Sequence, residues 1–365
     1  MSTSSIAKLN EFGQAPWYDN ITRTMVREGG LEQLVRDDGI RGVTSNPTIF
    51  EKAIAGGEGY DEAIAAAQQA GDSIEATFWD LATDDIGRGA DILRPVHDAL
   101  DGNDGFISIE VSPKLAHDTD ATIAQAKELF ARLGRPNVMI KIPATPEGLP
   151  AITAVIGAGI NVNVTLIFAL ERYGEVIDAY MAGLEALAAS GGDLASVHSV
   201  ASFFVSRVDT EVDRRLPEGS PLRGKAAVAN AKIAYEQFRA SLATERWAAL
   251  AAKGATVQRP LWASTSTKND SYSPTLYVDT LIGPDTVNTL APKSIEALHA
   301  PGVELRANTV TEGVEDAHRA LADLEAAGVS MDDVTATIER EGVASFAASY
   351  DDLLAALTKR AAELA

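Results

Sequence analysis

The chain has 365 residues, of which 46% are apolar and 23% are charged, a composition typical of a globular protein with a large core. It carries 31 Lys and Arg against 52 Asp and Glu, which gives a net charge of −21. An acidic surface of this kind repels phosphate backbones and anionic lipids, and this argues against a nucleic-acid-binding or membrane-surface protein. An anionic substrate would therefore require a few basic groups gathered in a pocket.

Short apolar runs alternate along the chain with longer amphipathic stretches. The runs are rich in Val, Ile, Phe and Thr and mostly lack polar alternation, as is typical of parallel strands buried on both faces. We predict eight strands, at residues 16–21, 42–46, 106–112, 138–144, 161–167, 199–206, 259–265 and 287–291.

The stretches between these runs predict helices. Within 118–134 the apolar residues recur at helical spacing, Asp118 or Thr119 is suited to cap the start, and Gly134 is suited to end the helix. The stretch 151–170 approaches the ~20 apolar residues of a membrane span. Its internal Gly and Asn residues favour a helix end, a turn and a buried strand instead.

Strands that alternate with helices indicate parallel βαβ units. The sequence contains neither GxGxxG nor GxxxxGK[ST], so a nucleotide-binding doubly wound sheet is disfavoured. We predict one (β/α)8 barrel domain over residues 1–365, with a helical insertion near 50–101 and C-terminal helices near 310–365. The sequence leaves open whether the C-terminal helices cover the barrel mouth or lie on its outside.

The chain contains no cysteine, which excludes disulfides, thiolate catalysis and thiolate-bound metals. Its five histidines show neither HxxxH nor HExxH spacing, so no metal site is expected. The first residues, MSTSSIAKLNEFGQ, lack the apolar segment of a secretory signal. A cytoplasmic location is therefore expected.

Lys141 is the most informative polar residue of the predicted strands, because it lies in the apolar run VMIKIPA. Burial disfavours the charged form of an amine, and a neutral amine is a nucleophile for a carbonyl group. A lysine at this position can also extend to solvent or form an ion pair with a carboxylate.

Two carboxylates, Glu110 and Asp19, are also predicted within strands. A buried carboxylate must pair with a cation or act as an acid or base, so Glu110 beside Lys141 is either a structural ion pair or a proton-transfer group. Asp19 is also suited to begin a turn with Asn20.

Other polar residues are placed near the predicted barrel mouth. Asn163 and Thr165 are two residues apart in one strand and so face the same side. Asn46 precedes Pro47, which favours an extended residue leaving a strand end. Arg207 and Lys268 follow two further strands and would bind a phosphate between them, or would lie as separate surface cations.

At these residues the sequence resembles the transaldolases, in the longer form known from actinobacteria and cyanobacteria. The resemblance covers nearly the whole chain in order, and its lysine and SNP motifs together are specific. It is carried by the segments GVTSNPTIF, ISIEVSP, NVMIKIPATPEGLPAI, INVNVTLIF, SVASFFVSRVD and LWASTSTKND.

The resemblance implies a class I aldol transferase of the pentose phosphate pathway that needs no metal or organic cofactor. Lys141 would form a Schiff base with a ketose phosphate, and proton transfer would fall to Glu110, Thr165 and Asp19, the first two in part through a bound water. The implied substrate-binding residues are Asn46, Asn163, Ser202, Phe204, Arg207, Ser264 or Ser266, and Lys268. Some family members carry an arginine where this chain has Lys268.

Three other functions remain open at this stage. Fructose 6-phosphate aldolases resemble the chain at the lysine but carry a glutamine and a tyrosine in place of Glu110 and Phe204. A non-catalytic barrel would bind sugar phosphates with Lys141 and Glu110 as a structural ion pair, and a lysine enzyme would use pyridoxal phosphate. Barrels of this kind are often homodimers, but the sequence identifies no interface.

Overall fold

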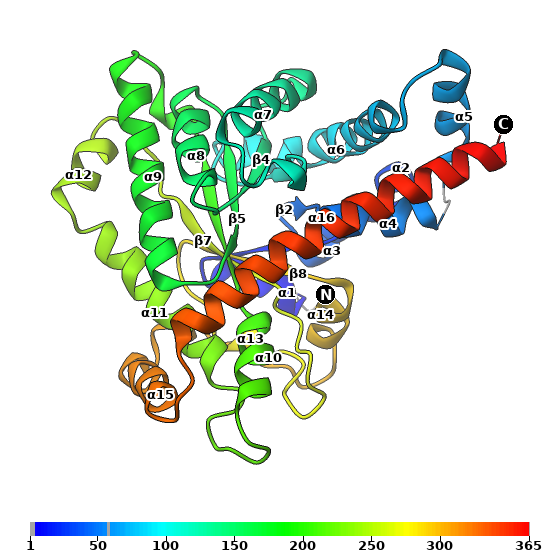
Figure 1. Cartoon of the computed structure of the whole chain (residues 1–365). Coiled ribbons are helices and arrows are strands. Elements are labelled where there is room, and N and C mark those ends of the chain that lie inside the picture. Colours follow the sequence, from blue (N-terminus) through cyan, green and yellow to red (C-terminus); the bar gives the residue numbers. More distant parts are fainter. Residues whose placement is uncertain (1–3, 57–58, 365) are drawn as a thin grey trace.

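In the computed structural model, which describes residues 4–56 and 59–364, eight parallel strands form a closed barrel. Each strand pairs with the next along the chain, and β8 closes the barrel against β1. The predicted (β/α)8 barrel is confirmed (Figure 1). The strands are β1 (Gln14–Tyr18), β2 (Gly42–Thr44), β3 (Phe106–Glu110), β4 (Val138–Pro143), β5 (Val162–Ile167), β6 (Ser199–Phe204), β7 (Arg259–Ala263) and β8 (Thr286–Leu290).

Each of the eight predicted runs overlaps a strand, but several ends differ. β1 stops at Tyr18, so the prediction that Asp19 lies inside a strand is wrong. The Asp19 N–H still donates to the Leu290 carbonyl at 3.0 Å, and the chain then turns towards the next helix. β2 stops at Thr44, because Pro47 begins a helix whose N-cap is Asn46.

Helices cover the outside of the barrel and extend beyond it. The helix predicted at 118–134 is α7, with Asp118 as its N-cap and Gly134 in the left-handed region at its end, as expected. The α-helices are α1 (Ser5–Glu11), α2 (Arg23–Arg27), α3 (Gly30–Asp38), α4 (Pro47–Ala55), α5 (Asp61–Ala70), α6 (Ile74–Ala99), α7 (Thr119–Leu133), α8 (Gly148–Gly157), α9 (Leu170–Ala189), α10 (Ser206–Arg215), α11 (Ala226–Ser241), α12 (Glu245–Ala251), α13 (Leu276–Asp279), α14 (Pro292–Leu298), α15 (Val314–Ala326) and α16 (Met331–Leu364). Three 3-10 turns are η1 (Pro113–Leu115), η2 (Leu194–Ser196) and η3 (Thr309–Thr311).

Two groups of helices depart from the simple alternation of strand and helix. Helices α4, α5 and α6 lie between β2 and β3, in the predicted insertion near 50–101. At the other end, α15 and α16 follow β8. The stretch 151–170 forms the end of α8, a turn and β5, as predicted, and the described part of the chain contains no helix suited to span a membrane.

Helix α16 lies across the barrel and packs against α4, α5, α6 and α10. In Figure 1 it runs diagonally, in orange and red, in front of the strands from α15 to α5. Its residue Phe346 lines a cavity at the carboxyl ends of the strands. The question that the sequence left open is therefore settled: this C-terminal helix covers the barrel mouth.

The opposite, amino-terminal end of the barrel is filled by side chains that form hydrogen bonds with one another. Asp104 accepts hydrogen bonds from Trp17 Nε1 at 2.9 Å and from Arg259 at 3.0 Å. Trp17 and Trp262 are fully buried, and the strands are almost entirely inaccessible. Polar groups that remain accessible to a ligand therefore gather at the carboxyl ends of the strands, where barrel enzymes carry their active sites.

Candidate active site

A cavity of about 260 Å³ opens at the carboxyl ends of the strands. Ten of the twelve predicted site residues line it: Asp19, Asn46, Lys141, Thr165, Ser202, Phe204, Arg207, Ser264, Ser266 and Lys268. The two others, Glu110 and Asn163, are buried beside it and contact residues that line it. The structure thus brings all twelve residues into one region, from strands and loops far apart in the sequence.

Lys141 projects from β4 and is buried, with 6% of its side chain exposed. Strand pairing places it directly opposite Glu110 on β3, and Lys141 Nζ lies 3.3 Å from Glu110 Oε2. Nζ also donates to the Ser45 carbonyl at 3.2 Å. Burial raises the pKa of the Glu110 carboxyl, while the neighbouring Lys141 charge opposes that shift.

Asp19 follows β1 and reaches the same cavity from the other side. Its Oδ1 accepts a hydrogen bond of 2.7 Å from Thr44 Oγ1 at the end of β2. Thr44 itself lines the cavity. This hydrogen bond to Oδ1 orients the Asp19 carboxylate, and the other oxygen, Oδ2, stays available to a ligand.

A chain of buried hydrogen bonds runs behind Lys141. Asn163 on β5 accepts from Ser202 Oγ at 2.7 Å, and its amide nitrogen donates to Ser108 Oγ at 3.0 Å. Ser202 lines the cavity, whereas Asn163 does not. Asn163 therefore fixes the orientation of Ser202. Asn46 lines the cavity, and its Oδ1 caps α4 by accepting from the Ile49 N–H at 3.0 Å, which leaves the amide nitrogen to bind a ligand.

β5 is irregular where it reaches the cavity. Its pairing with β6 shifts between Val164 and Ile167, and Leu166 adopts the left-handed region at φ 59°. Thr165 lies at this bulge and lines the cavity. Its hydroxyl is buried and has no hydrogen-bond partner within the described residues. Glu110 Oε2 is also buried, and Lys141 Nζ at 3.3 Å is its ion-pair partner.

Two cations stand on one side of the cavity. Arg207 is the second residue of α10, and Lys268 lies in the loop after β7. No carboxylate of the described chain lies within ion-pair distance of either group, although the protein is strongly acidic. Burial lowers the pKa of both side chains, and the Arg207 charge lowers that of Lys268 further. Two neighbouring unpaired cations are the arrangement that an anionic substrate requires.

The serines beside these cations lie in the turn after β7. Ser264 adopts φ 56°, and its hydroxyl lies 2.9 Å from that of Ser206. The Ser266 hydroxyl lies 2.8 Å from that of Ser294. Since both Ser264 and Ser266 line the cavity, either hydroxyl is placed to contact an anion held by the cations.

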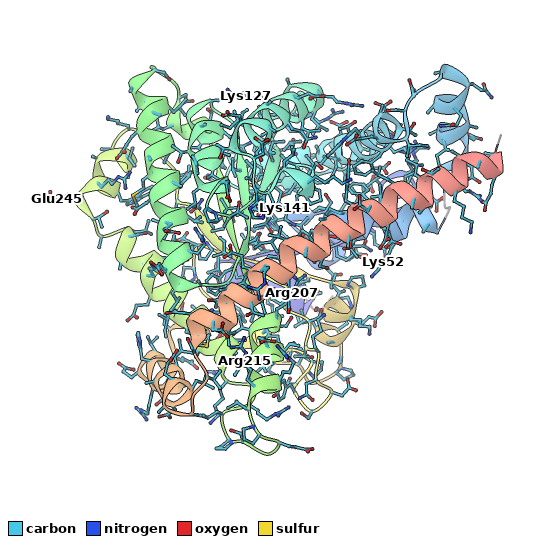
Figure 2. All side chains as sticks on the ribbon, viewed as in Figure 1. Lys52, Lys127, Lys141, Arg207, Arg215 and Glu245 are labelled. Carbon is cyan, nitrogen blue, oxygen red and sulfur yellow. The ribbon has the colours of Figure 1, made fainter. Side chains whose placement is uncertain are left out.

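Sequence reasoning missed cavity residues from two helices. Thr48, Ile49 and Lys52 belong to α4, directly after the SNP motif, and that motif was the available signal for them. Phe346 belongs to α16, where it reads as one more apolar residue at helical spacing. Figure 2 labels Lys141, Arg207 and Lys52, all close to the line of α16.

Residues 4–56 and 59–364 hold no group of three His, Cys, Asp or Glu side chains arranged to bind a metal ion. The described side chains in and beside the cavity offer an amine, the two carboxylates Asp19 and Glu110, hydroxyl groups and cations. A buried amine beside a carboxylate is suited to form and hydrolyse an imine.

Comparison with known proteins identifies the family of the chain. The transaldolase/fructose-6-phosphate aldolase family model matches residues 16–357. "Transaldolase 1" of Streptomyces coelicolor is 50% identical over 98% of this chain and 95% of its own length. "Transaldolase" of Saccharopolyspora erythraea is 48% identical over 97% and 96%, and that of Acidothermus cellulolyticus is 49% identical over 98% and 97%. With a match over nearly all of its length and a cavity built around a buried lysine, the chain belongs to the transaldolase/fructose-6-phosphate aldolase family.

Proposed function

We propose that the protein is a transaldolase that moves a dihydroxyacetone unit from sedoheptulose 7-phosphate to glyceraldehyde 3-phosphate, giving erythrose 4-phosphate and fructose 6-phosphate. The observation that carries this proposal is Lys141, a buried amine 3.3 Å from the Glu110 carboxyl, which faces a cavity lined by two unpaired cations. The amine supplies the covalent chemistry, and the cations supply the site for the phosphate.

The reaction begins at the carbonyl group of the ketose. The Lys141 amine adds to C2, and loss of water from the adduct gives an iminium ion. Glu110 and Thr165 serve the proton transfers of this step, since Glu110 Oε2 lies 3.3 Å from Lys141 Nζ and the buried Thr165 hydroxyl has no hydrogen-bond partner in the described chain. Asn46 and Ser202 bind the hydroxyl groups of the three-carbon unit, and Asn163 holds Ser202 in place.

Bond cleavage follows from the positive charge of the iminium. Asp19 takes the proton of the C4 hydroxyl, the C3–C4 bond breaks, and its electron pair moves into the iminium to form an enamine. Erythrose 4-phosphate leaves. Glyceraldehyde 3-phosphate then accepts the enamine carbon at its aldehyde, Asp19 returns the proton, and water hydrolyses the Schiff base to release fructose 6-phosphate.

The phosphate fits beside Arg207 and Lys268, with Ser264 or Ser266 as hydroxyl donors. A guanidinium and an ammonium together neutralise a phosphate, and an arginine fork binds two of its oxygens. Both aldose phosphates carry this group at the far end from the reacting carbon, so one cationic site serves both.

The proposal extends to the enzyme's surroundings. Sugar phosphates are charged and are made within the cell, which supports a cytoplasmic location. A homodimer is the expected assembly for a barrel of this kind, and sedimentation of the purified protein measures it.

A transfer assay with a matched pair of lysine variants tests this function. Purified protein is given sedoheptulose 7-phosphate and glyceraldehyde 3-phosphate, and fructose 6-phosphate formation is followed. Lys141→Met should abolish transfer, and Lys127→Met, which removes an exposed lysine of α7 (Figure 2), should leave it unchanged. Cleavage of fructose 6-phosphate to free dihydroxyacetone without transfer would make the protein an aldolase of the same family.

A further inference from the structure

Phe346 on α16 contacts both halves of the candidate active site. Its side chain lines the cavity, with 5% of the residue exposed. The centre of its ring lies 5.8 Å from Lys141 Nζ and 5.8 Å from the Arg207 guanidinium carbon. A single aromatic ring thus lies against the nucleophile and against the proposed phosphate ligand.

Arg207 is held between two aromatic rings. Its guanidinium carbon lies 5.2 Å from the centre of the Phe204 ring and 5.8 Å from that of Phe346. Aromatic faces attract a cation without neutralising it, so the guanidinium keeps its charge and its donors for a ligand. The two rings therefore orient Arg207 without competing with a phosphate, as a carboxylate partner would.

Gly342, one helical turn before Phe346, leaves room for this arrangement. A Cβ atom on Gly342 would lie 3.1 Å from Leu166 Cδ2 and 3.3 Å from Arg207 Nη1. The helix backbone thus approaches Arg207 and the bulge of β5 closely, and it covers the cavity at this point.

Contacts on both sides of Phe346 fix α16 in place. Thr48 donates to Ser349 at 2.8 Å, and Tyr350 donates to Glu75 at 2.8 Å. Ion pairs add to these bonds: Arg215–Asp333 at 2.5 Å, Lys114–Asp351 at 2.7 Å and Arg360–Asp61 at 2.6 Å. Because these partners come from α10, α4, α6, η1 and α5, the helix is a fixed cover over the cavity.

We propose that Phe346 is the positioning residue that decides between transfer and release of the three-carbon unit, because its ring keeps water from the enamine on Lys141. This inference rests on the proposed function. It assigns the choice between two products to the C-terminal helix, outside the strands that carry the reacting groups.

The competing reaction consumes one water molecule. The enamine takes up a proton from water at its carbon atom, which converts it to an iminium ion. Hydroxide then adds to the former carbonyl carbon, the C–N bond breaks, and free dihydroxyacetone and the Lys141 amine are released. An apolar ring over Lys141 disfavours this sequence, since water must reach the enamine carbon before the acceptor aldehyde does.

The test compares release with transfer in Phe346 variants. Protein is mixed with fructose 6-phosphate alone, and glyceraldehyde 3-phosphate and free dihydroxyacetone are counted per protein chain. Erythrose 4-phosphate is then added, and sedoheptulose 7-phosphate is measured. Phe346→Ala removes the ring, Phe346→Leu keeps an apolar side chain should the smaller residue prevent folding, and Phe238→Ala is the control, a buried Phe of α11 outside the cavity.

Without the acceptor, the wild-type protein should stop after about one equivalent of glyceraldehyde 3-phosphate per chain, because the enamine is retained. Phe346→Ala should continue past that point, with the ratio of release to transfer raised on the order of tenfold, and Phe346→Leu should show a smaller rise in the same direction. Phe238→Ala should keep the wild-type ratio.

Two outcomes separate this inference from the function on which it rests. If the wild-type protein neither forms glyceraldehyde 3-phosphate nor transfers, the proposed function is wrong. If it transfers and both folded Phe346 variants keep the ratio of wild type and Phe238→Ala, the proposed function stands and the role of Phe346 is overturned.

Discussion

Glu110 and Lys141 face each other across neighbouring strands, and their side chains approach to 3.3 Å inside the barrel. The pairing of β3 with β4 sets this contact, because a shift of one residue would turn one side chain away from the barrel interior. The carboxyl is therefore positioned at the amine by the backbone of the sheet.

Glu110→Gln should lower kcat about 100-fold, because the amide cannot exchange protons with the Lys141 adducts. The substitution keeps the size of the side chain, so the free energy of unfolding should stay close to that of the wild type or increase, given that burial raises the pKa of Glu110. Steady-state kinetics and denaturant unfolding measure the two effects. Full activity in the variant would show that the Glu110–Lys141 ion pair has a structural role and takes no part in proton transfer.

Asp19→Asn should stop the reaction after the Schiff base has formed. The amide cannot take the C4 hydroxyl proton, so the C3–C4 bond stays intact. Borohydride reduction in the presence of fructose 6-phosphate should then attach the whole six-carbon sugar phosphate to Lys141. A three-carbon adduct in this variant would show that another group removes the proton.

Thr44→Val should have a weaker effect of the same kind, since it removes the 2.7 Å hydrogen bond that orients Asp19. A loss of about tenfold in kcat, with little change in KM, is the expected result for a positioning bond.

Arg207→Met should weaken phosphate binding far more than Arg246→Met. Arg207 faces the cavity without a carboxylate partner in the described chain, whereas Arg246 pairs with Asp178 and Glu185 away from the cavity and from α16. The KM for fructose 6-phosphate should rise about 10- to 100-fold in the first variant only. As a second readout, added inorganic phosphate should raise the Tm of wild type and Arg246→Met, but not that of Arg207→Met.

Gly342→Ala should raise the KM for phosphorylated substrates several-fold, because the new methyl group would lie 3.3 Å from Arg207 Nη1. Its Tm should stay close to that of the wild type, because the ~1 kcal/mol by which alanine favours a helix over glycine is opposed by the 3.1 Å approach of the new methyl group to Leu166 Cδ2. Gly174→Ala in α9, where the methyl group meets only Gln237, is the matched control and should keep the wild-type KM. Equal KM values in the two variants would argue against the close approach of α16 to Arg207.

Asp209 should give the stability of the protein a pH dependence. Burial raises its pKa to about 6, and it accepts hydrogen bonds from the Ala227 N–H and Tyr277. Since the folded state holds this proton more tightly than the unfolded state, the stability it contributes is present at low pH and is lost as the pH rises from 4 to 6. Relative to wild type, Asp209→Asn should therefore gain ~2 kcal/mol in free energy of unfolding across that range. Parallel curves for the two proteins would contradict the raised pKa.

The repeating pattern of the sequence was sufficient to predict the barrel. Unalternated apolar runs such as 138–144 and 161–167 are typical of strands buried on both faces of a parallel sheet, and the residues that cap α7 can be recognised in the sequence. Lys141 stood out because a charged residue inside an apolar strand is costly without a role or a partner.

The strand ends and the cover of the cavity could not be predicted in the same way. Asp19 was placed inside β1, because nothing local marks the residue at which pairing with β8 ends. Phe346 approaches Lys141 only because α16 docks over the cavity. The spacing of apolar residues around Phe346 would be the same in a helix that packs elsewhere in the core. The family resemblance implies a substrate-binding role for Asn163, but its side chain is fully buried two residues before Thr165 in β5, and only Thr165 lines the cavity.

Reductive trapping tests the central claim most directly. Wild-type protein, Lys141→Met and Lys127→Met are treated with borohydride in the presence of fructose 6-phosphate, digested, and mapped by mass spectrometry. We expect a three-carbon adduct on Lys141 in the wild type and in Lys127→Met, and no adduct in Lys141→Met. Folded wild-type protein that stays unmodified, under conditions that trap a known Schiff-base aldolase, would contradict it.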